Sequence, residues 1–502
     1  MKYDYIIIGS GLGGLCSSII MSKENKKVLV LEQHFKAGGY LHSFKRKGYQ
    51  FETGFHFSPE LGNGQILRMY WKYLGILDKL ELVPYNSNHF HSLIFPDMKL
   101  DLLSGLDNLQ QLLIDTFPVE ADTIVTYIQK IKEIKQYFVY FNANHKGDMD
   151  MEHKSFEISI SDYLTSIGAS EKLKGVLLAH SYLYGVPPKE TPLGTHAIFF
   201  NALYSSSTDI KGGGDALNNA LVESLKENGG EIHFKKKVTQ IKTENKVIKG
   251  VETEDGTFYE CDNIIFSANP TLSFNMFNED IFRSTYTNRI SEMENTTSHF
   301  GLYAAVDVDL SNHKNDVLYF PDYNIDRLYE SAASDMPQDA FLYYTVPTAR
   351  LGVTGDNKHL IETISMDNYN NYTKWSKTKF GKRPEDYTTF KDKIKENVLH
   401  QLYSILPEIK NKVTFIEAST PLTNEHFTMS PMGSIYGIKH SMSQMRAPIR
   451  ARTKLNGFYY TGQSLIFPGI VGVTITSFVT CSDILGQDYL FNKIDKEVKG
   501  DF

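Results

Sequence analysis

The sequence lacks the patterns that mark disulfide-rich, membrane-spanning and nucleic-acid-binding proteins. Its three cysteines, Cys16, Cys261 and Cys481, are far apart and form no C-x-x-C pair, so neither a disulfide framework nor a structural zinc site is expected. No uninterrupted apolar run reaches about 18 residues, which argues against a transmembrane helix. Lys and Arg number 52 against 59 Asp and Glu, and a net charge of −7 gives no electrostatic reason to expect nucleic acid or a polybasic lipid anchor.

What remains is the composition of a globular protein, with 41% hydrophobic and 22% charged residues. A chain of 502 residues has room for two or three domains, or for one large domain with an insertion. Apolar β-type sequence begins by Tyr5, which leaves no room for a signal peptide. Because isolated cysteines fit a reducing compartment, we expect a cytoplasmic protein.

The N-terminal residues carry a nucleotide-binding pattern. KYDYIIIGSGLGG predicts a buried strand that runs into a glycine turn, where Gly9, Gly11 and Gly14 fit G-x-G-x-x-G. A helix is expected next, since apolar residues of 12–20 recur at i, i+3, i+4, i+7 and i+8. Gly9 permits the tight turn, Gly11 lets a pyrophosphate approach the backbone, and Gly14 allows the helix to pack closely on the strand. The pattern predicts dinucleotide binding.

The choice of dinucleotide depends on the residues that follow. KKVLVLE predicts a second strand ending at Glu32, which is placed to accept hydrogen bonds from a ribose diol and disfavours the 2′-phosphate of NADP. An NAD domain would continue to alternate helices and strands, whereas KAGGYLHSF and KGYQFETGFHF predict a hairpin with glycine turns. Gly38 and Gly39 would give a bulky, flat cofactor access to the backbone. These features, with only one G-x-G-x-x-G, favour FAD over NAD.

A second match lies near the other end, in GFYYTGQSLIFPGIVGVTITSF. A strand is expected over 457–460, followed by Thr-Gly-Gln and then by PGIVG, which looks like a glycine-rich helix N-terminus. Such a terminus suits an anion or a flavin carbonyl. A helix dipole aimed at the pyrimidine edge of a flavin would stabilise the reduced, anionic ring.

These motifs resemble the FAD-dependent family of phytoene desaturases, carotenoid isomerases and retinol saturases. LEQHFKAGGYLHSF followed by FETGFHF is similar to the retinol saturase and carotenoid isomerase branch. YGVPPKETPLGTHAIFFNALY and IKGGGDALNNAL resemble its middle region, and the TGQ…PG…G run resembles its C-terminal flavin segment. The similarity spans nearly the whole chain, in order.

The resemblance implies an α/β fold in which a Rossmann-type FAD-binding domain, of the glutathione reductase and amine oxidase kind, is joined to a discontinuous α+β substrate domain. We expect residues 1–86, 210–270 and 434–502 to form the FAD-binding domain. Residues 87–209 and 271–433 are expected to form the substrate domain.

The resemblance also implies the residues that contact FAD. In order along the cofactor, from pyrophosphate and adenosine to the ribityl-flavin portion, they are Gly9, Gly11, Gly14, Glu32, Val238, Gly38, Gly39, Gly462, Gln463, Gly469, Ile470 and Val471. Three departures leave the substrate environment open. Tyr40 stands where many relatives in the wider amine oxidase superfamily have Arg, Glu52 replaces a common Asp, and residues 209–211 replace an aromatic-Pro pair.

The reaction would require that a C–H or C=C bond be held over the flavin and that water be excluded. Reactions of this kind can also use a side-chain acid or base. His56, in ETGFH, is the candidate catalytic residue; the alternative is a histidine that packs at the flavin edge. Glu52 is expected to be structural, satisfying backbone N–H groups. Four further residues either line the substrate channel or belong to ordinary core and surface, the second being favoured: His180, Tyr182, Tyr184 and His196.

Two other readings are weaker. Glu32, His34 and His42 are crowded together, but their spacing has no metal-ligand logic, so no metal site is expected. Residues 64–80 predict a helix with an apolar side, for which a buried core face is favoured over a face that touches a membrane or a channel entrance.

The function expected is that of an FAD-dependent oxidoreductase acting on carbon–carbon bonds of a hydrophobic polyene or isoprenoid lipid, such as a carotenoid or retinoid. Saturation, desaturation and isomerisation remain open, as do a quinone, oxygen or a reductase as electron partner and peripheral contact with a membrane. One alternative is an FAD-dependent amine oxidase. Another is a non-enzymatic prenyl- or lipid-binding escort protein of the same fold, which the presence of Glu32 and of the C-terminal TGQ…PGIVG run disfavours.

Overall fold

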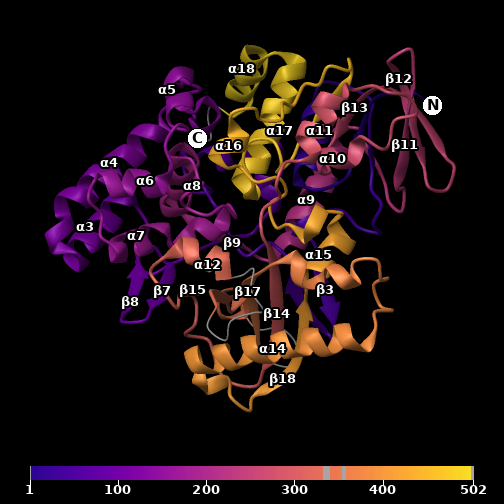
Figure 1. The fold of residues 1–502 in the computed structure, drawn as a ribbon. Coiled ribbons are helices and arrows are strands. Elements are labelled where there is room, and N and C mark those ends of the chain that lie inside the picture. Colours follow the sequence, from indigo (N-terminus) through magenta and orange to yellow (C-terminus); the bar gives the residue numbers. More distant parts are fainter. Residues whose placement is uncertain (1, 332–339, 353–357, 499–502) are drawn as a thin grey trace.

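The computed structural model describes residues 2–331, 340–352 and 358–498. Residues 1, 332–339, 353–357 and 499–502, which fall within the ranges predicted for both domains, lie outside it. Two seven-stranded sheets organise the described chain, one near each end of the molecule (Figure 1). We call them the first sheet and the second sheet.

The first sheet combines strands from the beginning, middle and end of the chain. Its parallel strands, in spatial order, are β10 (Glu231–His233), β2 (Val28–Leu31), β1 (Lys2–Ile8), β13 (Phe258–Phe266) and β19 (Phe458–Tyr460). The antiparallel β12 (Val247–Thr253) and β11 (Val238–Glu244) extend it beyond β13. Strands that are covered on both faces have continuous apolar sequences, as III of β1 and VLVL of β2 show here.

Three helices pack beside this sheet, and their contacts depend on small residues. Helix α1 (Leu12–Lys23) joins β1 to β2 and contacts both α17 (Gly469–Leu485) and α9 (Gly213–Glu227). The Ser477 hydroxyl of α17 donates a hydrogen bond of 3.1 Å to the Gly13 carbonyl of α1. Because α1 is surrounded, it is apolar all round, and its residues 12–22 are buried.

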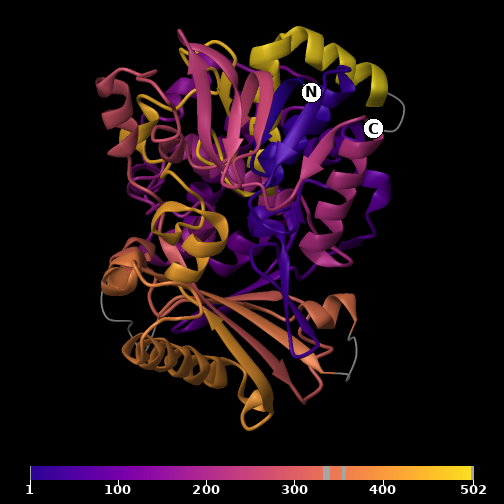
Figure 2. The ribbon, with the colours of Figure 1, turned by 90° about the vertical axis from the view of Figure 1, so that its right-hand side faces the viewer.

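The second sheet has one face toward a long helix and the other toward the body of the molecule (Figure 2). Its strands, in spatial order, are β18 (Val413–Ser419), β14 (Ser298–Val306), β17 (His359–Asp367), β16 (Leu342–Thr345), β15 (Asp316–Tyr319), β7 (His91–Phe95) and β8 (Met98–Leu102). Helix α14 (Glu385–Ile405) covers the first face, where Leu302 and Leu402 share an apolar cluster. Successive side chains of β14 and β17 alternate between α14 and the body of the molecule.

A helical layer flanks the sheets (Figure 1). Its main members are α3 (Leu106–Thr116), α4 (Ala121–Lys135) and α8 (Leu193–Ser205), and α4 packs on α8. The helix predicted over 64–80 is shorter, with α2 at Ile66–Tyr73 followed by a 3₁₀ turn at Leu77–Lys79. The six residues of its predicted apolar side are all buried, which confirms the core face over the membrane face: Ile66, Leu67, Tyr70, Tyr73, Leu74 and Leu77.

Smaller elements complete the description. The predicted hairpin is present as β3 (Ser43–Arg46) and β4 (Tyr49–Glu52). A three-stranded sheet is formed by β5 (Ser58–Pro59), β9 (Ser207–Ile210) and β6 (Leu82–Pro84). The remaining α-helices are α5 (Met149–Lys154), α6 (Ile160–Ser166), α7 (Glu171–Leu178), α10 (Pro270–Ser273), α11 (Ser284–Ser291), α12 (Ile325–Ser331), α13 (Pro347–Leu351), α15 (Pro421–Thr428), α16 (Met442–Met445) and α18 (Gln487–Val498). Among the described residues, no helix combines the length and apolarity needed to cross a bilayer.

The packing of α1 on β1 yields a test of stability. A Cβ added to Gly14 would collide with the Gly9 carbonyl oxygen and lie 3.1 Å from the Ser267 hydroxyl. We therefore expect Gly14→Ala to lower the free energy of unfolding by about 1–3 kcal/mol, the usual range for overpacking, as measured by denaturant titration. Gly11→Ala is the matched control, because a Cβ there meets no atom within 4 Å and its φ of −62° suits any residue. Equal losses in the two variants would contradict this account.

Candidate active site

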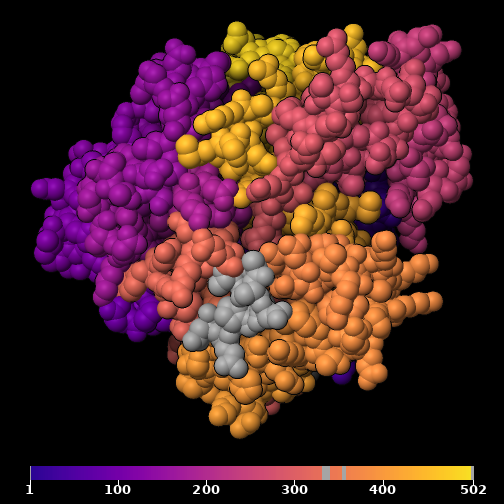
Figure 3. All heavy atoms as spheres, in the orientation of Figure 1, coloured from indigo at the N-terminus to yellow at the C-terminus, as the bar shows by residue number. Residues whose placement is uncertain are grey.

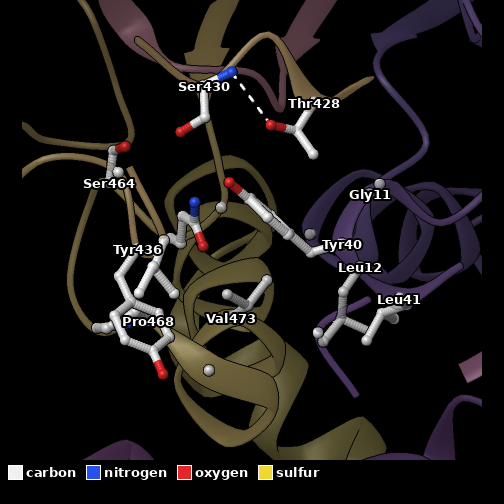
Figure 4. A pocket seen from close by; sticks show the side chains of 18 of the residues that line it. Gly11, Leu12, Tyr40, Leu41, Thr428, Ser430, Tyr436, Ser464, Pro468 and Val473 are labelled. Atoms are coloured by element: carbon white, nitrogen blue, oxygen red, sulfur yellow. Dashed lines mark hydrogen bonds between the residues drawn. The ribbon is translucent and has the colours of Figure 1, made fainter. Parts of the chain in front are cut away.

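A cavity of about 610 Å³ lies at the carboxyl ends of the parallel strands of the first sheet and beneath the second sheet. Ile8, Leu31 and Phe266, at the ends of β1, β2 and β13, contribute to its wall. This edge is where ligands bind in open α/β sheets. Part of the lining is shown in Figure 4.

All but one of the residues predicted to contact the cofactor or substrate line this cavity. They are Gly9, Gly11, Glu32, Gly38, Gly39, His56, Val238, Gly462, Gln463, Gly469, Ile470 and Val471. Gly14 is the exception. It lies within α1 behind the turn, where the Gly9 carbonyl leaves no space for a side chain.

Two glycine segments lie against each other at the phosphate end. Gly11 and Gly38 form an isolated parallel bridge, and the Gly38 N–H donates to the Ser10 carbonyl at 3.0 Å. Gly38 has a φ of 124°, and a Cβ added there would collide with the carboxamide of Asn218. Only glycine therefore permits this approach of α9 to the turn.

The Glu32 carboxylate is held by the same turn. One oxygen accepts the Ser10 N–H at 2.9 Å and the Ser10 hydroxyl at 2.6 Å, and the other accepts the His34 N–H at 2.8 Å. A carboxylate has about four lone-pair sites. Glu32, 8% exposed and on the cavity wall, therefore retains capacity for one more donor such as a ribose hydroxyl.

The N-terminus of α17 forms another part of the wall. Pro468 precedes the helix, no side chain caps its first N–H groups, and Gly469 has a φ of 75°. Figure 4 shows Tyr40 and Tyr436 on either side of Val473, on the first turns of α17. The Tyr40 hydroxyl donates to the Ser434 carbonyl at 2.8 Å, and burial raises the pKa of Tyr40 to about 12.

These features fit a flavin dinucleotide. Gly9, Gly11, Gly38 and Gly39 form a glycine cradle that admits a pyrophosphate, and the carboxylate of Glu32 suits a ribose. The uncapped N–H groups of α17 attract the electron-rich edge of an isoalloxazine ring. The cavity has charged side chains only at the end near Glu32, among the described residues. They are Glu32, Lys236 and Lys237, and the Lys236 N–H donates a hydrogen bond of 2.8 Å to the Glu32 carbonyl.

The rest of the cavity is apolar. It is lined by Phe57, Phe141, Leu183, Ile198, Phe199, Ala202, Leu203, Phe341, Ile364, Met366 and Phe467. Four polar side chains also line it: His56, His299, Tyr182 and Tyr343. Within the described part of the chain, no carboxylate, lysine or arginine lines this apolar compartment.

His56 lies on the wall of the apolar compartment with a carboxylate behind it. Its Nδ1 is 3.2 Å from Oε2 of Glu362, whose side chain is 2% exposed. The Glu52 N–H donates to the other Glu362 oxygen at 2.7 Å. Burial and the nearby Glu362 raise the pKa of the Glu52 carboxyl well above its usual value, and its Oε2 accepts the Gly214 N–H at 3.1 Å. The prediction that Glu52 satisfies a backbone N–H is confirmed.

The four candidate channel residues of the middle segment do not all reach the cavity. Tyr182 lines the cavity, whereas His180, Tyr184 and His196 lie behind the wall. The His196 ring lies between the hydroxyls of Tyr127, at 2.7 Å, and Tyr184, at 3.1 Å, and burial lowers its pKa to about 3. Ordinary core placement is therefore confirmed for His196.

The remaining sequence features are structural. His34 and His42 stack with ring centroids 5.1 Å apart, and burial lowers the pKa of His42 to about 4. The described residues contain no cluster of three or more groups able to hold a metal ion. Asp209, one of the three departures from the family pattern, pairs with the buried Arg350 at 3.2 Å.

The second-sheet wall was not predicted from the sequence. Tyr343 comes from β16 and Phe341 directly precedes that strand, Ile364 and Met366 come from β17, and His299 comes from β14. The alternation of side chains along each strand predicts two faces from the sequence. Which residues share a face follows only from the pairing of the strands, which places His299 opposite Met366 and Tyr343 opposite Ile364.

Comparisons with known proteins agree with this site. Residues 12–349 match the family model described as flavin containing amine oxidoreductase. The all-trans-retinol 13,14-reductase of Danio rerio is 25% identical over 530 residues, which cover 96% of this chain and 86% of that protein. The chloroplastic prolycopene isomerase of Arabidopsis thaliana is 22% identical over 527 residues, covering 97% and 83%.

A solved structure shares the fold. An oxidoreductase from Methanosarcina mazei superposes with a TM-score of 0.68 at 17% sequence identity, covering 96% of this chain and 100% of that one. The Rossmann-type sheet, the glycine cradle and the family match lead to one assignment. The chain belongs to the family of flavin containing amine oxidoreductases and is a flavin-dependent oxidoreductase.

Proposed function

We propose that this protein binds FAD and acts on a carbon–carbon bond of a hydrophobic polyene or isoprenoid lipid. The observation that carries the proposal is the apolar compartment, which adjoins the glycine cradle in one cavity and holds no charged side chain apart from the titratable histidines. When bound, FAD would supply hydride or electron exchange. Relatives named for reactions on retinol, prolycopene and diapophytoene support a substrate of this class.

The proposed cofactor contacts follow the order of the cavity wall. Gly9, Gly11, Gly38 and Gly39 would admit the pyrophosphate, and Glu32 would accept a ribose hydroxyl. Val238 would contact the adenine region through its backbone. The flavin would be held by Gly462, Gln463 and the first residues of α17, namely Gly469, Ile470 and Val471.

The apolar wall would do three things for the reaction. Phe199, Phe341 and Ile364 exclude water from the reacting bond, and their shape orients an extended apolar chain. His56 would hold or move a proton at the wall, since it is the titratable side chain there with a carboxylate behind it. Saturation, desaturation and isomerisation are all compatible with these roles.

An amine substrate fits the compartment less well. Amines bind as cations at neutral pH, and a buried cation needs a carboxylate or an aromatic cage. Tyr40 and Tyr436 offer aromatic rings, but no carboxylate among the described residues lines the apolar compartment. Oxidation of an amine is therefore an outcome that the flavin-reduction experiment would reveal, and not the proposed function.

We further propose that the protein is cytoplasmic and contacts membranes through an aromatic and cationic surface near the cavity. Phe35 and Phe380 are 64% and 41% exposed, and ring contacts through His34 and Phe427 connect them, with Phe427 on the cavity wall. The segment before α14, at the right-hand edge of Figure 3, adds three lysines that make no ion pair among the described residues: Lys377, Lys379 and Lys382. Exposed rings beside free cations favour an anionic lipid surface.

The cofactor proposal predicts the behaviour of Gly11→Ala. The added methyl group would enter the cavity without disturbing the protein, so flavin affinity should fall about tenfold or more, equivalent to about 1.4 kcal/mol, while the unfolding transition of the apoprotein stays unchanged. Flavin dissociation is followed by absorbance, and the flavin released from the wild type on denaturation should chromatograph as FAD. Release of FMN alone, or undiminished affinity in the variant, would contradict the proposal.

The substrate proposal predicts which compounds exchange electrons with the bound flavin. Under anaerobic conditions, a photoreduced sample should be reoxidised by a polyene such as all-trans-retinol if the reaction is saturation, with the saturated product seen by chromatography. An oxidised sample should be reduced by the polyene if it is desaturation, and a quinone or oxygen is then added as the acceptor. A reductase is tested as the electron donor if the reaction is saturation. Isomer formation without net flavin turnover would indicate an isomerase.

His56→Gln should slow whichever of these reactions occurs by about 10²–10⁴-fold, the range for general acid–base catalysis, without releasing flavin. Reduction of the flavin by amines, with hydrogen peroxide formed in air and no response to any polyene, would overturn the proposal in favour of an amine oxidase.

The membrane proposal predicts co-sedimentation with vesicles that contain phosphatidylserine. Lys379→Ser should weaken binding about fivefold, since each cation near the surface contributes about 1 kcal/mol, and Phe380→Ser should weaken it further. The control is Val119→Ser, which removes an apolar side chain that is 99% exposed elsewhere. Absence of wild-type binding, or equal effects in all three variants, would rule out this surface.

A further inference from the structure

Behind His56 lies a pair of buried carboxyl groups from two different sheets. Glu362 is central in β17, where its neighbours across the strands are Tyr303 of β14 and Thr345 of β16. Glu52 ends β4, the hairpin strand that contacts β17. The 2.7 Å hydrogen bond from the Glu52 N–H to Glu362 Oε1 fixes the Glu362 carboxylate, so its other oxygen faces His56.

His56 is the basic side chain that faces this pair. No lysine or arginine of the described residues lies within 4.0 Å of Glu362 or Glu52. Glu52 is directed instead to the Gly214 N–H, and burial together with Glu362 raises its pKa, which favours the protonated form. Oε2 of Glu362 is therefore left to the imidazole.

The two facing atoms have no competing partners. Apart from their 3.2 Å contact, neither His56 Nδ1 nor Glu362 Oε2 has a hydrogen-bond partner in the described chain, and neither does His56 Nε2. The contact is close but not yet aligned as a hydrogen bond, which is common at catalytic groups before a ligand is bound. The ring is 5.4 Å from Tyr343, which also lines the cavity.

We propose that Glu362 is a positioning residue that keeps the proton of neutral His56 on Nδ1, so that Nε2 presents its lone pair to the apolar compartment. A carboxylate accepts a hydrogen bond but donates none, so the nitrogen that faces it carries the hydrogen. The second nitrogen of a neutral imidazole is then an acceptor, as in other sites where a carboxylate orients a histidine. A neutral histidine without such a partner favours the Nε2–H form.

The other groups around the ring do not substitute for Glu362. The Tyr85 hydroxyl reaches the His56 backbone carbonyl at 3.4 Å, and Asp316 bonds Tyr85 and Arg350 rather than His56. His299 of β14 is near enough to His56 for their charges to repel, and burial lowers its pKa to about 4, so it stays neutral. Glu362 is therefore the group that sets the tautomer.

The test uses flavin-loaded protein labelled with ¹⁵N-histidine. Long-range ¹H–¹⁵N spectra distinguish the two tautomers, and His56→Gln assigns the His56 signals. At a pH where the ring is neutral, the wild type should show the Nδ1–H form. Glu362→Leu should convert His56 largely to the Nε2–H form. Glu362→Gln should do the same, because its single amide oxygen is held by the Glu52 N–H and its NH2 group, a donor, then faces Nδ1.

The matched control is Glu417→Leu, in the same row of the sheet but on the far side of Tyr303, where the carboxylate pairs with Lys391 instead. It should leave the His56 signals unchanged. An Nε2–H tautomer in the wild type would overturn the proposal, even if Glu362→Leu failed to fold. Retention of Nδ1–H in a folded Glu362→Leu protein would also overturn it.

A kinetic arm connects the tautomer to the reaction. It rests on the proposed function: with a polyene that turns over, Glu362→Leu and Glu362→Gln should each lower kcat about as much as His56→Gln and leave KM little changed. If no polyene reacts, the proposed function fails while the tautomer result stands. If a polyene reacts and Glu362→Leu keeps full kcat, the positioning role fails and the proposed function stands.

Discussion

A Cβ placed on Gly13 would come within 2.9 Å of the Gly462 Cα, and one on Gly214 would collide with the Leu41 carbonyl oxygen. Contact between backbones is therefore the constraint on which the site depends. It brings the start of α1, the segment before α17 and the start of α9 together, although they are hundreds of residues apart in sequence. Since a methyl group at these positions would separate the segments, the residues that form the cradle are determined by steric exclusion more than by attraction.

The second sheet separates the apolar cluster under α14 from the cavity. Leu302 and its strand neighbours pack on α14, while His299, Ile364 and Met366 face the cavity. The same face also carries Glu362 in a position where it meets the hairpin that bears Glu52 and, just beyond it, His56. The buried carboxyl group of Glu362 thus lies where a titratable partner, His56, comes from another part of the chain. Buried charges are tolerated when they are paired in this way.

The sequence was sufficient for the nucleotide half of the molecule because its signals are local. The turn at Gly9, the strand ending in Glu32 and the helix that begins at Gly469 each depend on a few consecutive residues, and the structure places them together on one cavity. The proposed division into domains depends on where the chain leaves and re-enters the first sheet, which periodicity indicates only roughly. The substrate half could not be derived in the same way. Tyr343 reaches the cavity, and Glu362 reaches His56, through the register of antiparallel strands, and register is set by packing between distant segments.

The cradle and the apolar compartment are parts of one continuous cavity, with walls that meet near His56 and α17. A flat cofactor held in the cradle would itself form one side of the space left for the substrate. The two binding equilibria are then linked, and linkage is reciprocal: whatever factor the cofactor adds to substrate affinity, the substrate adds to cofactor affinity. The apoprotein would accordingly be a poor receptor for lipid, and a cell that is short of flavin would lose substrate capture together with turnover.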